Sequence, residues 1–499
     1  MLYRSSSITH IEVRQCIMKA ILAVKSKKDE DVTATAVAML RTFENTEALG
    51  IASSNAMKIG KSIEKLQREN LSSSVIVGCA FSKTLKDDAF PLKALKNSMV
   101  AFDGRIYSSQ KVTSTKNTIK NLSNLKTARK FVKETDGDFA FVSAETERLI
   151  AGRDVFGARP LYCGENEKFL ALASERKALW TAGIKNTMPF PSGHIAYVEK
   201  DSFKITPAKI LAYSKPKQIQ MEEAVEKLSR LFENSVKKKV FGLKQVAVAF
   251  SGGLDSSLIA ATAKNEGVNV HLIHVSLEKQ PETMQAKKAA ESLGLPIHIY
   301  QYKEEDVEKI LSKVLWLIEE PDSLKTSIGI PICWTAEKTR ELGFRVLLAG
   351  QGADELFGGY ERYTRGYLSS DAEQVKKSMF NDVLNLSENN IERDFKICNF
   401  HDVELRLPFA TYSIAKFAID LPIELKIDMQ RDGLRKLVLR QTAKKMGLPI
   451  FIVDKPKKAI QYATGIDKTL RKIAKKEKMS LKEYLIKTFQ TMKNVKNYA

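Results

Sequence analysis

No apolar run in the 499-residue sequence approaches the roughly 18 residues that a membrane-spanning helix requires. The N-terminal segment also lacks the uncharged apolar stretch of a secretion signal, because Lys19 interrupts its only apolar run. The five cysteines form no C-x-x-C pair, and their odd number does not favour a disulfide framework or a zinc site. We therefore expect a protein of the reducing cytoplasm that does not span a membrane.

Acidic residues are in deficit, which leaves a formal net charge of +21 at pH 7. Such a charge is compatible with nucleic-acid binding. The excess is spread over lysine-rich helix faces, for example at 457–487, without an aromatic-interleaved patch or a nucleic-acid motif. A solvated lysine surface that also attracts anionic substrates is the favoured interpretation. A hydrophobic content of 43% with 28% charged residues is ordinary for a globular protein and excludes general disorder.

The chain divides into two parts with different hydrophobic patterns. Residues 18–212 contain short strand-like runs, such as "SVIVGCAF" and "DFAFVSA", between helical stretches, which predicts an α+β layered domain. A polar segment at 212–220 contains Pro216 and precedes a long helical pattern. We expect the domain boundary there, with a second domain at 221–480.

The second part alternates apolar strands with helices. Strands are expected at 246–250, 270–275, 297–302 and 345–350. Near-continuous apolar strands separated by helices predict a doubly wound parallel sheet of the α/β class. In such sheets ligands bind beyond the carboxyl ends of the strands. Two glycine-rich loops, 251–256 and 350–359, lie at such ends and are the candidate binding loops.

The first loop combines anion-binding groups with a carboxylate. Backbone amides of Ser251, Gly252 and Gly253, the Ser256 hydroxyl and the N-terminus of the following helix favour an anion. The spacing fits neither the Walker A motif nor G-x-G-x-x-G. Asp255 would repel a phosphate unless a divalent cation lies between them. We therefore predict a Mg²⁺ ion that bridges Asp255 and a pyrophosphate group. The alternative is a purely structural role, a glycine-rich turn with a serine cap.

The second loop supplies further carboxylates, Asp354 and Glu355, after another strand. Carboxylates from two neighbouring strand–helix units can share one Mg²⁺ with the phosphates of ATP. On this interpretation Asp255 and Asp354 are the metal ligands. The alternative is a polar loop that caps a helix.

The motif "SGGLDSS" at 251–257, paired with "GADELFGGY" at 352–360, resembles the asparagine synthetase family and its ATP pyrophosphatase loop. Weaker similarities run through the chain in the family's order. The resemblance implies an N-terminal class II glutamine amidotransferase domain, a sandwich of the N-terminal-nucleophile-hydrolase type. It also implies a HUP-like doubly wound sheet of the N-type ATP pyrophosphatases. The supporting blocks are "FDGRIY" (102–107), "DGDFAF" (136–141), "RDVFGARPLYC" (153–163), "ASERKAL" (173–179), "PSGH" (191–194), "ELRLPFATYSIAKFAIDLP" (404–422) and "GLRKLVLR" (433–440).

The resemblance implies a ligase that activates a carboxylate, aspartate in the family, as an acyl-adenylate with release of pyrophosphate. Ammonia or another amine then displaces AMP. The family's catalytic lysine corresponds to Lys457, with Lys458 as the competing register. Arg406 is a candidate contact for the substrate carboxylate, and Gln351 lies at the amine or aspartate end of the pocket. The family's adenine contacts correspond to Ala249, Val275, Ala349 and Gly350.

The amidotransferase part departs from the family pattern. Lys19 occupies the position of the nucleophilic cysteine, and Cys16 lies nearby but out of register. Glu44 aligns near the arginine that holds the glutamine carboxylate, and Arg105 replaces an acid. We therefore expect an inactive glutaminase.

Two alternatives stay open. Because Gln351 stands where asparagine synthetases often have glutamate, and Thr411 where aspartate is common, the enzyme could activate a different carboxylate, as cyclising β-lactam synthetases do. A non-catalytic or RNA-associated relative is the second, and retention of Ser251, Asp255, Asp354 and Lys457 argues against it. A homodimer is compatible with the sequence, which does not determine the oligomeric state.

Overall fold

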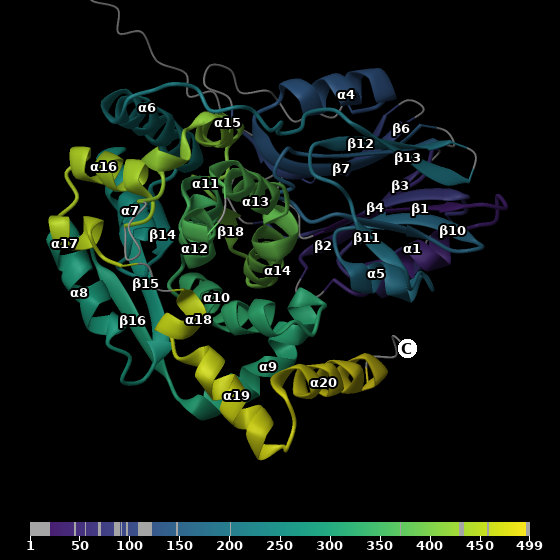
Figure 1. The fold of residues 1–499 in the computed structure, drawn as a ribbon. Helices are drawn as coiled ribbons and strands as arrows, with labels where there is room; N and C mark the ends of the chain where they lie inside the picture. Colours follow the sequence, from purple (N-terminus) through teal and green to yellow (C-terminus); the bar gives the residue numbers. More distant parts are fainter. Residues whose placement is uncertain are drawn as a thin grey trace, which may run out of the picture.

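The computed structural model describes residues 20–43, 46–54, 56–67, 71–83, 90, 92–95, 98–107, 122–145, 148–199, 201–369, 371–428, 434–456 and 459–495. Within these ranges the chain forms two antiparallel sheets followed by one parallel sheet. Figure 1 shows the antiparallel part, purple to blue, beside the helix-rich part, teal to yellow.

The N-terminal part is a sandwich of two sheets. One sheet has the strand order β11-β9-β10-β1-β4-β2-β3 and the other β13-β12-β8-β7-β6-β5. The first sheet comprises β1 (Ala20–Ser26), β2 (Ala48–Ala52), β3 (Met57–Gly60), β4 (Val75–Phe81), β9 (Tyr162–Glu165), β10 (Phe169–Ala173) and β11 (Thr187–Pro189). The second comprises β5 (Leu92–Leu95), β6 (Ser98–Ile106), β7 (Gly137–Glu145), β8 (Arg148–Arg153), β12 (His194–Glu199) and β13 (Ser202–Pro207).

The strands of the sandwich bury both faces, as β1 illustrates. Ile21 and Ala23 of β1 face the core between the sheets, whereas Leu22 and Val24 pack under helices on the outer face. This follows from the period of two in a strand, which sends alternate side chains to opposite faces. The covering helices are α1 (Thr33–Leu40), α2 (Ile63–Gln67) and α5 (Arg176–Thr181) on the first sheet and α4 (Leu125–Glu134) on the second.

The second part is built on a parallel sheet with strand order β16-β15-β14-β17-β18. The predicted doubly wound α/β sheet is confirmed, although β17 is shorter than expected and β18 was not predicted. Its strands are β14 (Gln245–Ala249), β15 (Asn269–Leu277), β16 (Ile297–Tyr302), β17 (Val346–Leu348) and β18 (Glu404–Arg406).

Helices surround this sheet and extend beyond it to the C-terminal side (Figure 1). The 3₁₀ turn Ile423–Leu425 and the π-helical turn Ser387–Ile391, here called the π-turn, interrupt the series. The first helices are α6 (Met221–Val240), α7 (Leu254–Asn265), α8 (Glu282–Leu293), α9 (Glu304–Ile318), α10 (Ser323–Glu341), α11 (Ala353–Phe357), α12 (Glu361–Ser369) and α13 (Ala372–Leu384). The remainder are α14 (Glu392–Phe400), α15 (Tyr412–Asp420), α16 (Leu437–Lys445), α17 (Ile450–Val453), α18 (Ile460–Ala463), α19 (Ile466–Lys476) and α20 (Leu481–Val495).

Buried ion pairs join the two parts. Lys239 of α6 pairs with Asp138 at 2.6 Å, and Glu392 of α14 pairs with Arg153 at 3.0 Å. Strand β13 ends at Pro207 and α6 begins at Met221, so the predicted boundary at 212–220 falls between two elements and stays a prediction. None of the helices in the described ranges is long and apolar enough to cross a membrane.

Candidate active site

The loop after β14 adopts a tight turn that only glycine permits at its second position. Gly252 has φ of 65°, and a Cβ there would come within 2.7 Å of the Ala286 backbone of α8. Ser251 is exposed, and its hydroxyl lies 3.3 Å from that of Ser256 in the first turn of α7. The Ser251 amide donates to Ser256 Oγ at 3.4 Å and the Gly253 amide donates to Ser251 Oγ at 3.3 Å, so amides and hydroxyls gather beside the N-terminus of a twelve-residue helix at one exposed position. That position suits an anion.

The two carboxylates predicted as metal ligands lie together. The ammonium of Lys436 is 2.7 Å from a carboxylate oxygen of Asp255 and 2.7 Å from one of Asp354. Asp255 and Asp354 follow the adjacent strands β14 and β17, whose register pairs Val248 with Leu348. Sheet order thus brings the two loops to one edge, as predicted.

The residues fit a divalent cation. Two carboxylates converge on one positively charged group, so the electrostatic field between them favours a cation. Carboxylate oxygens are also the ligands that Mg²⁺ prefers. The structure adds Lys436, which sequence reasoning missed because its block "GLRKLVLR" contains several basic residues and nothing marks this one. Lys436 is only 3% exposed and has the left-handed φ of 63°.

Glu355 has a different role from its neighbour Asp354. Its carboxylate is buried and accepts hydrogen bonds from Tyr360 Oη at 2.5 Å and Asn390 Nδ2 at 2.8 Å. Burial, followed by the charge of Asp354, raises the pKa of Glu355 above its ordinary value of 4.5. Glu355 therefore anchors the loop to the π-turn, and Asp354 faces the Lys436 side.

Gln351 is held by Asp394, a residue that sequence reasoning did not select. Its Nε2 donates to a carboxylate oxygen of Asp394 in α14, and Arg393 Nε donates to the other oxygen at 2.7 Å. Asp394 is fully buried. Among the described residues the buried Oε1 of Gln351 has no hydrogen-bond donor. The amide group is thus oriented, with an acceptor atom still available.

The positions predicted to contact adenine lie at the same edge of the sheet. Ala249 is the last residue of β14, Ala349 directly follows the adjacent strand β17, and Val275 lies near the carboxyl end of β15. A Cβ on Gly350 would lie 3.2 Å from the Cβ of Asp255. The four positions therefore share the carboxyl edge of the sheet with the two loops, and their contact with a nucleotide stays a prediction.

Arg406 is placed differently from its predicted role. Its backbone carbonyl accepts from Ala349 N at 3.2 Å, but its guanidinium turns toward the sandwich and donates to Glu404 at 2.8 and 2.9 Å. Arg105 donates to the same carboxylate at 2.7 and 2.9 Å. The guanidinium of Arg406 is thus engaged at the domain interface, and this packing does not support the predicted contact with a substrate carboxylate.

Four residues of the sequence argument lie outside the described ranges: Lys457, Lys19, Cys16 and Glu44. The competing Lys458 does so as well. Lys455, which is described, has its ammonium 3.5 Å from the carbonyl oxygen of Gly252. The role of Lys457 stays a prediction.

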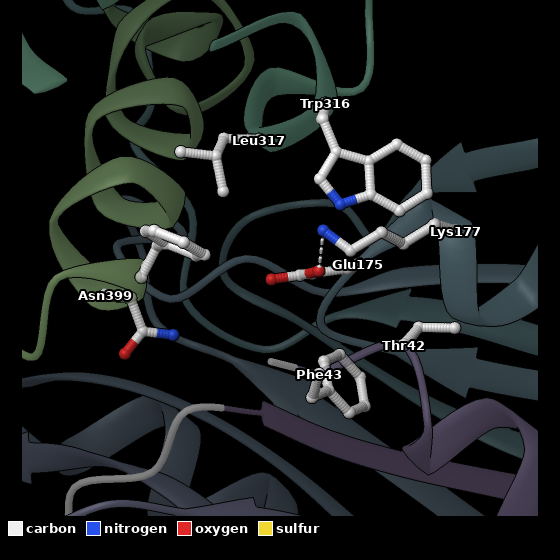
Figure 2. Close-up of a pocket in the computed structure, with 8 residues that line it drawn as sticks. Thr42, Phe43, Glu175, Lys177, Trp316, Leu317 and Asn399 are labelled. Atoms are coloured by element: carbon white, nitrogen blue, oxygen red, sulfur yellow. Dashed lines mark ion pairs between the residues drawn. The ribbon is translucent and has the colours of Figure 1, made fainter. Parts of the chain in front are cut away.

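A small pocket between the domains lies apart from both loops (Figure 2). It is lined by residues of the sandwich and of α9 and α14, among them Phe43, Glu175, Lys177, Trp316 and Asn399. Figure 2 shows the ion pair between Glu175 and Lys177, and the Lys177 ammonium lies 5.1 Å from the centre of the Trp316 ring. None of the residues predicted to carry the chemistry lines this pocket, so we assign it to domain packing.

Comparisons with known proteins agree with this arrangement. The asparagine synthase family model matches residues 227–375 and 367–487, and a glutamine amidotransferase domain model matches 83–181. The chain is 36% identical over 399 residues to a "putative asparagine synthetase [glutamine-hydrolyzing] 1" of Methanocaldococcus jannaschii, covering 70% of this chain and 73% of that protein. It is 27% identical over 367 residues to the human asparagine synthetase [glutamine-hydrolyzing], covering 66% of this chain and 64% of the human protein.

The match thus spans less than two thirds of the human relative. Among solved structures, a B. subtilis glutamine phosphoribosylpyrophosphate amidotransferase has 14% identity and a TM-score of 0.33, covering 56% of this chain and 65% of that one. That likeness is too low to support any inference about this chain. The predicted combination of an antiparallel amidotransferase-type sandwich and a parallel α/β domain is confirmed by the sheets and the two family models. The chain belongs to the asparagine synthase family of ligases and carries an N-terminal glutamine amidotransferase domain.

Proposed function

We propose that the protein is an ATP-dependent, AMP-forming amide ligase that activates the side-chain carboxylate of aspartate for attack by ammonia. The observation that carries the proposal is the convergence of Asp255, Asp354 and Lys436 beside the serine- and glycine-rich loop. The similarity to proteins named asparagine synthetases supports aspartate as the substrate. A cytoplasmic location goes with the proposal.

The chemistry requires an unreactive carboxylate oxygen to become a leaving group. The loop amides of Ser251–Gly253 and the N-terminus of α7 bind the pyrophosphate end of ATP, and Lys436 adds a positive charge. Mg²⁺ bound at Asp255 and Asp354 would offset the negative charge of the phosphates. Because these groups are held in place before reaction, they stabilise charge on the leaving pyrophosphate without reorganising. The strand ends at Ala249 and Ala349 position the nucleoside.

Gln351 is proposed to orient the reactants in the second half-reaction. Its amide is fixed by Asp394, and its Oε1 accepts a hydrogen bond from the α-ammonium of aspartate or from the attacking ammonia. Positioning of this kind lowers the barrier because the entropy of alignment is lost on binding rather than in the transition state.

Ammonia, rather than glutamine, is the proposed nitrogen donor. Lys19 replaces the cysteine that a glutaminase of this type requires. Arg105, at a family position for an acid, is buried and forms a two-pronged ion pair with Glu404 of the second domain. That side chain therefore supports domain packing.

A substrate panel scored by pyrophosphate release tests the proposal. Aspartate with ATP, Mg²⁺ and ammonium should release pyrophosphate and form asparagine. Asp255→Asn should abolish this release, because it removes one carboxylate from the cation site. Asp467→Asn, in the first turn of α19 where the carboxylate pairs with Arg471, is the matched control and should retain activity. If pyrophosphate is released only with another carboxylate, such as a β-amino acid that cyclises, that carboxylate would replace aspartate as the assigned substrate. No release with any carboxylate would overturn the function.

The nitrogen donor is tested separately with glutamine alone. We expect no glutamate from glutamine and full product formation from ammonium salts. Glutamate produced at the rate of asparagine synthesis would show an active glutaminase and contradict the proposed donor.

A further inference from the structure

The π-turn and α14 form one continuous segment, Ser387–Phe400, that contacts both the amidotransferase-type sandwich and the candidate active site. Figure 1 shows α14 on the side of the second domain that faces the sandwich. Residues four apart share a face of a helix, and residues two apart point in nearly opposite directions. The contacts of this segment follow that rule.

One face of the segment holds the active-site loop. Asn390 Nδ2 donates to Glu355 at 2.8 Å, and the Asp394 carboxylate accepts from Gln351. Asn390 and Asp394 are four residues apart. Both of their partners belong to the loop that carries Asp354.

The opposite face holds the sandwich. Glu392 accepts from Arg153 at 3.0 Å and from the hydroxyl of Tyr162 at 2.6 Å. Lys396, four residues further on, donates to the same hydroxyl at 3.2 Å. Arg153 also donates to Ser387 of the π-turn at 2.9 Å.

These contacts are buried and rigid. The side chains of Arg153 and Glu392 are 1% and 5% exposed. Arg153 also donates to the carbonyl oxygens of Gly157, Arg159 and Phe190, so its guanidinium is held in the sandwich. Burial by itself would raise the pKa of Glu392, but the charges of Arg153 and Lys396 outweigh it and lower that pKa. Glu392 therefore stays ionised and bound to the sandwich.

We infer that the sandwich positions the active-site loop through this segment, with Arg153 and Tyr162 as positioning residues. They fix Glu392, and Glu392 sets the rotation of the segment that presents Asn390 to Glu355 and Asp394 to Gln351. The π-turn is consistent with this role, since such turns often occur at functional sites. This role deepens the proposed function and rests on it for its catalytic readout. It also gives a reason for the sandwich to be required without glutamine hydrolysis.

The test compares two buried tyrosines of the sandwich. Tyr162→Phe removes the hydroxyl that donates to Glu392. Tyr107→Phe is the matched control, because its hydroxyl donates to Asp138 at 2.8 Å and Asp138 pairs with Lys239 of α6. Both hydroxyls are buried at the domain interface beside a carboxylate. Only Tyr162 touches α14.

In pyrophosphate-release assays, Tyr162→Phe should lower kcat/KM for the carboxylate substrate roughly 2- to 30-fold, the usual range for a residue that couples two sites. The KM for ATP should rise as well, because the same loop carries Asp354, which Lys436 joins to Asp255 at the proposed Mg²⁺ site. Tyr107→Phe should match wild type in both parameters, even if the two variants lose similar thermal stability. Equal kinetic effects of the two variants would show that the contact between Tyr162 and Glu392 only stabilises the fold, and this result would overturn the inference.

Amide hydrogen exchange of the complete, substrate-free protein tests the inference independently of catalytic activity. Tyr162→Phe should speed exchange in 351–357 and 388–396, and Tyr107→Phe should not, since local opening reflects the contacts that close each segment. Unchanged exchange there in Tyr162→Phe would overturn the inference even in an active enzyme. A wild-type protein that releases no pyrophosphate would instead refute the proposed function, and the exchange comparison would still decide the coupling.

Discussion

At the scale of single residues, Lys436 is the main addition that the structure makes to the candidate site. Two carboxylates on adjacent strand ends repel each other, and the ammonium between them offsets that repulsion. The residue holds a left-handed backbone conformation, which costs a non-glycine residue about 1–3 kcal/mol. Such strain persists where the surroundings require it, and here the side chain reaches Asp255 and Asp354 from that backbone.

Lys436→Met should lower the rate of pyrophosphate release by about 10²-fold, as for loss of one charged partner of the transition state. The variant should also require less Mg²⁺ for half-maximal activity, because the two carboxylates are then left without their fixed cation and attract the metal ion more strongly. Lys445→Met is the control on the same helix, since Lys445 is partly exposed and pairs with Glu226. A Lys436→Met enzyme with the rate and Mg²⁺ dependence of wild type would remove Lys436 from the mechanism.

At the scale of elements, the loop between β17 and α12 leaves no space beside its carboxylate. A Cβ at Gly359 would collide with the carboxylate of Asp354 and the side chain of Lys436. Gly358 has φ of 76° and ends α11, so the loop turns back at once toward the cation site. The glycines of "GADELFGGY" thus have a steric function at this position as well as a conformational one.

Gly359→Ala should therefore lower activity strongly and change the free energy of unfolding little. The added methyl group displaces the Asp354 carboxylate, which lies at the cation site rather than in the core. Gly366→Ala in α12 is the comparison, since among the described residues a Cβ there would have one neighbouring side chain within 4 Å, that of Val375 at 3.3 Å. The Gly366→Ala enzyme should keep wild-type activity. Steady-state kinetics and thermal unfolding of both variants measure the difference, and equal activities would show that the loop can adjust.

At the scale of the whole molecule, buried charge joins the two domains. Glu404 of β18 is paired with Arg105 of the sandwich and Arg406 of its own strand, and all three are buried. Removing charges from water is costly, so each must keep its partners. The domains are consequently expected to unfold together rather than to separate as intact units.

Acid should weaken this junction. Burial alone would raise the pKa of Glu404, but Arg105 and Arg406 lower it from 4.5 to about 2. A carboxylate whose folded pKa is depressed stabilises the fold above its unfolded pKa and loses that contribution as pH falls toward the folded value. The contribution should therefore be complete above pH 4.5 and disappear between pH 4.5 and about 2.

Glu404→Gln should lower the free energy of unfolding at neutral pH by about 3–5 kcal/mol, the cost of leaving buried partners unpaired. The difference in free energy of unfolding between Glu404→Gln and wild type should shrink as the pH falls through that range. Glu233→Gln, at an exposed position of α6, is the control and should change neither quantity. Denaturant unfolding at several pH values gives the measurement, and a difference independent of pH would contradict the assignment.

The local pattern of the sequence was sufficient for the elements that carry the two loops. Apolar strands that run into glycine and serine, as at 246–253, identify a strand end because backbone periodicity and turn chemistry are local properties. The meeting of Asp255 and Asp354 followed from the parallel sheet, since neighbouring strands end at one edge. These features needed no knowledge of distant contacts.

Contacts between distant residues were decided by the tertiary structure alone. Strand β18 has only three residues, two of them charged, so its pattern gives no strand signal. The partners of Lys436 and Arg105, and the partner Gln351 of Asp394, lie far away in sequence and depend on sheet order and side-chain direction. The guanidinium of Arg406 faces Glu404 for the same reason, because a charge buried at a domain interface must be paired there. The sequence by itself determined which two loops meet at one edge of the sheet, and the packing of two domains decided which charged groups surround them.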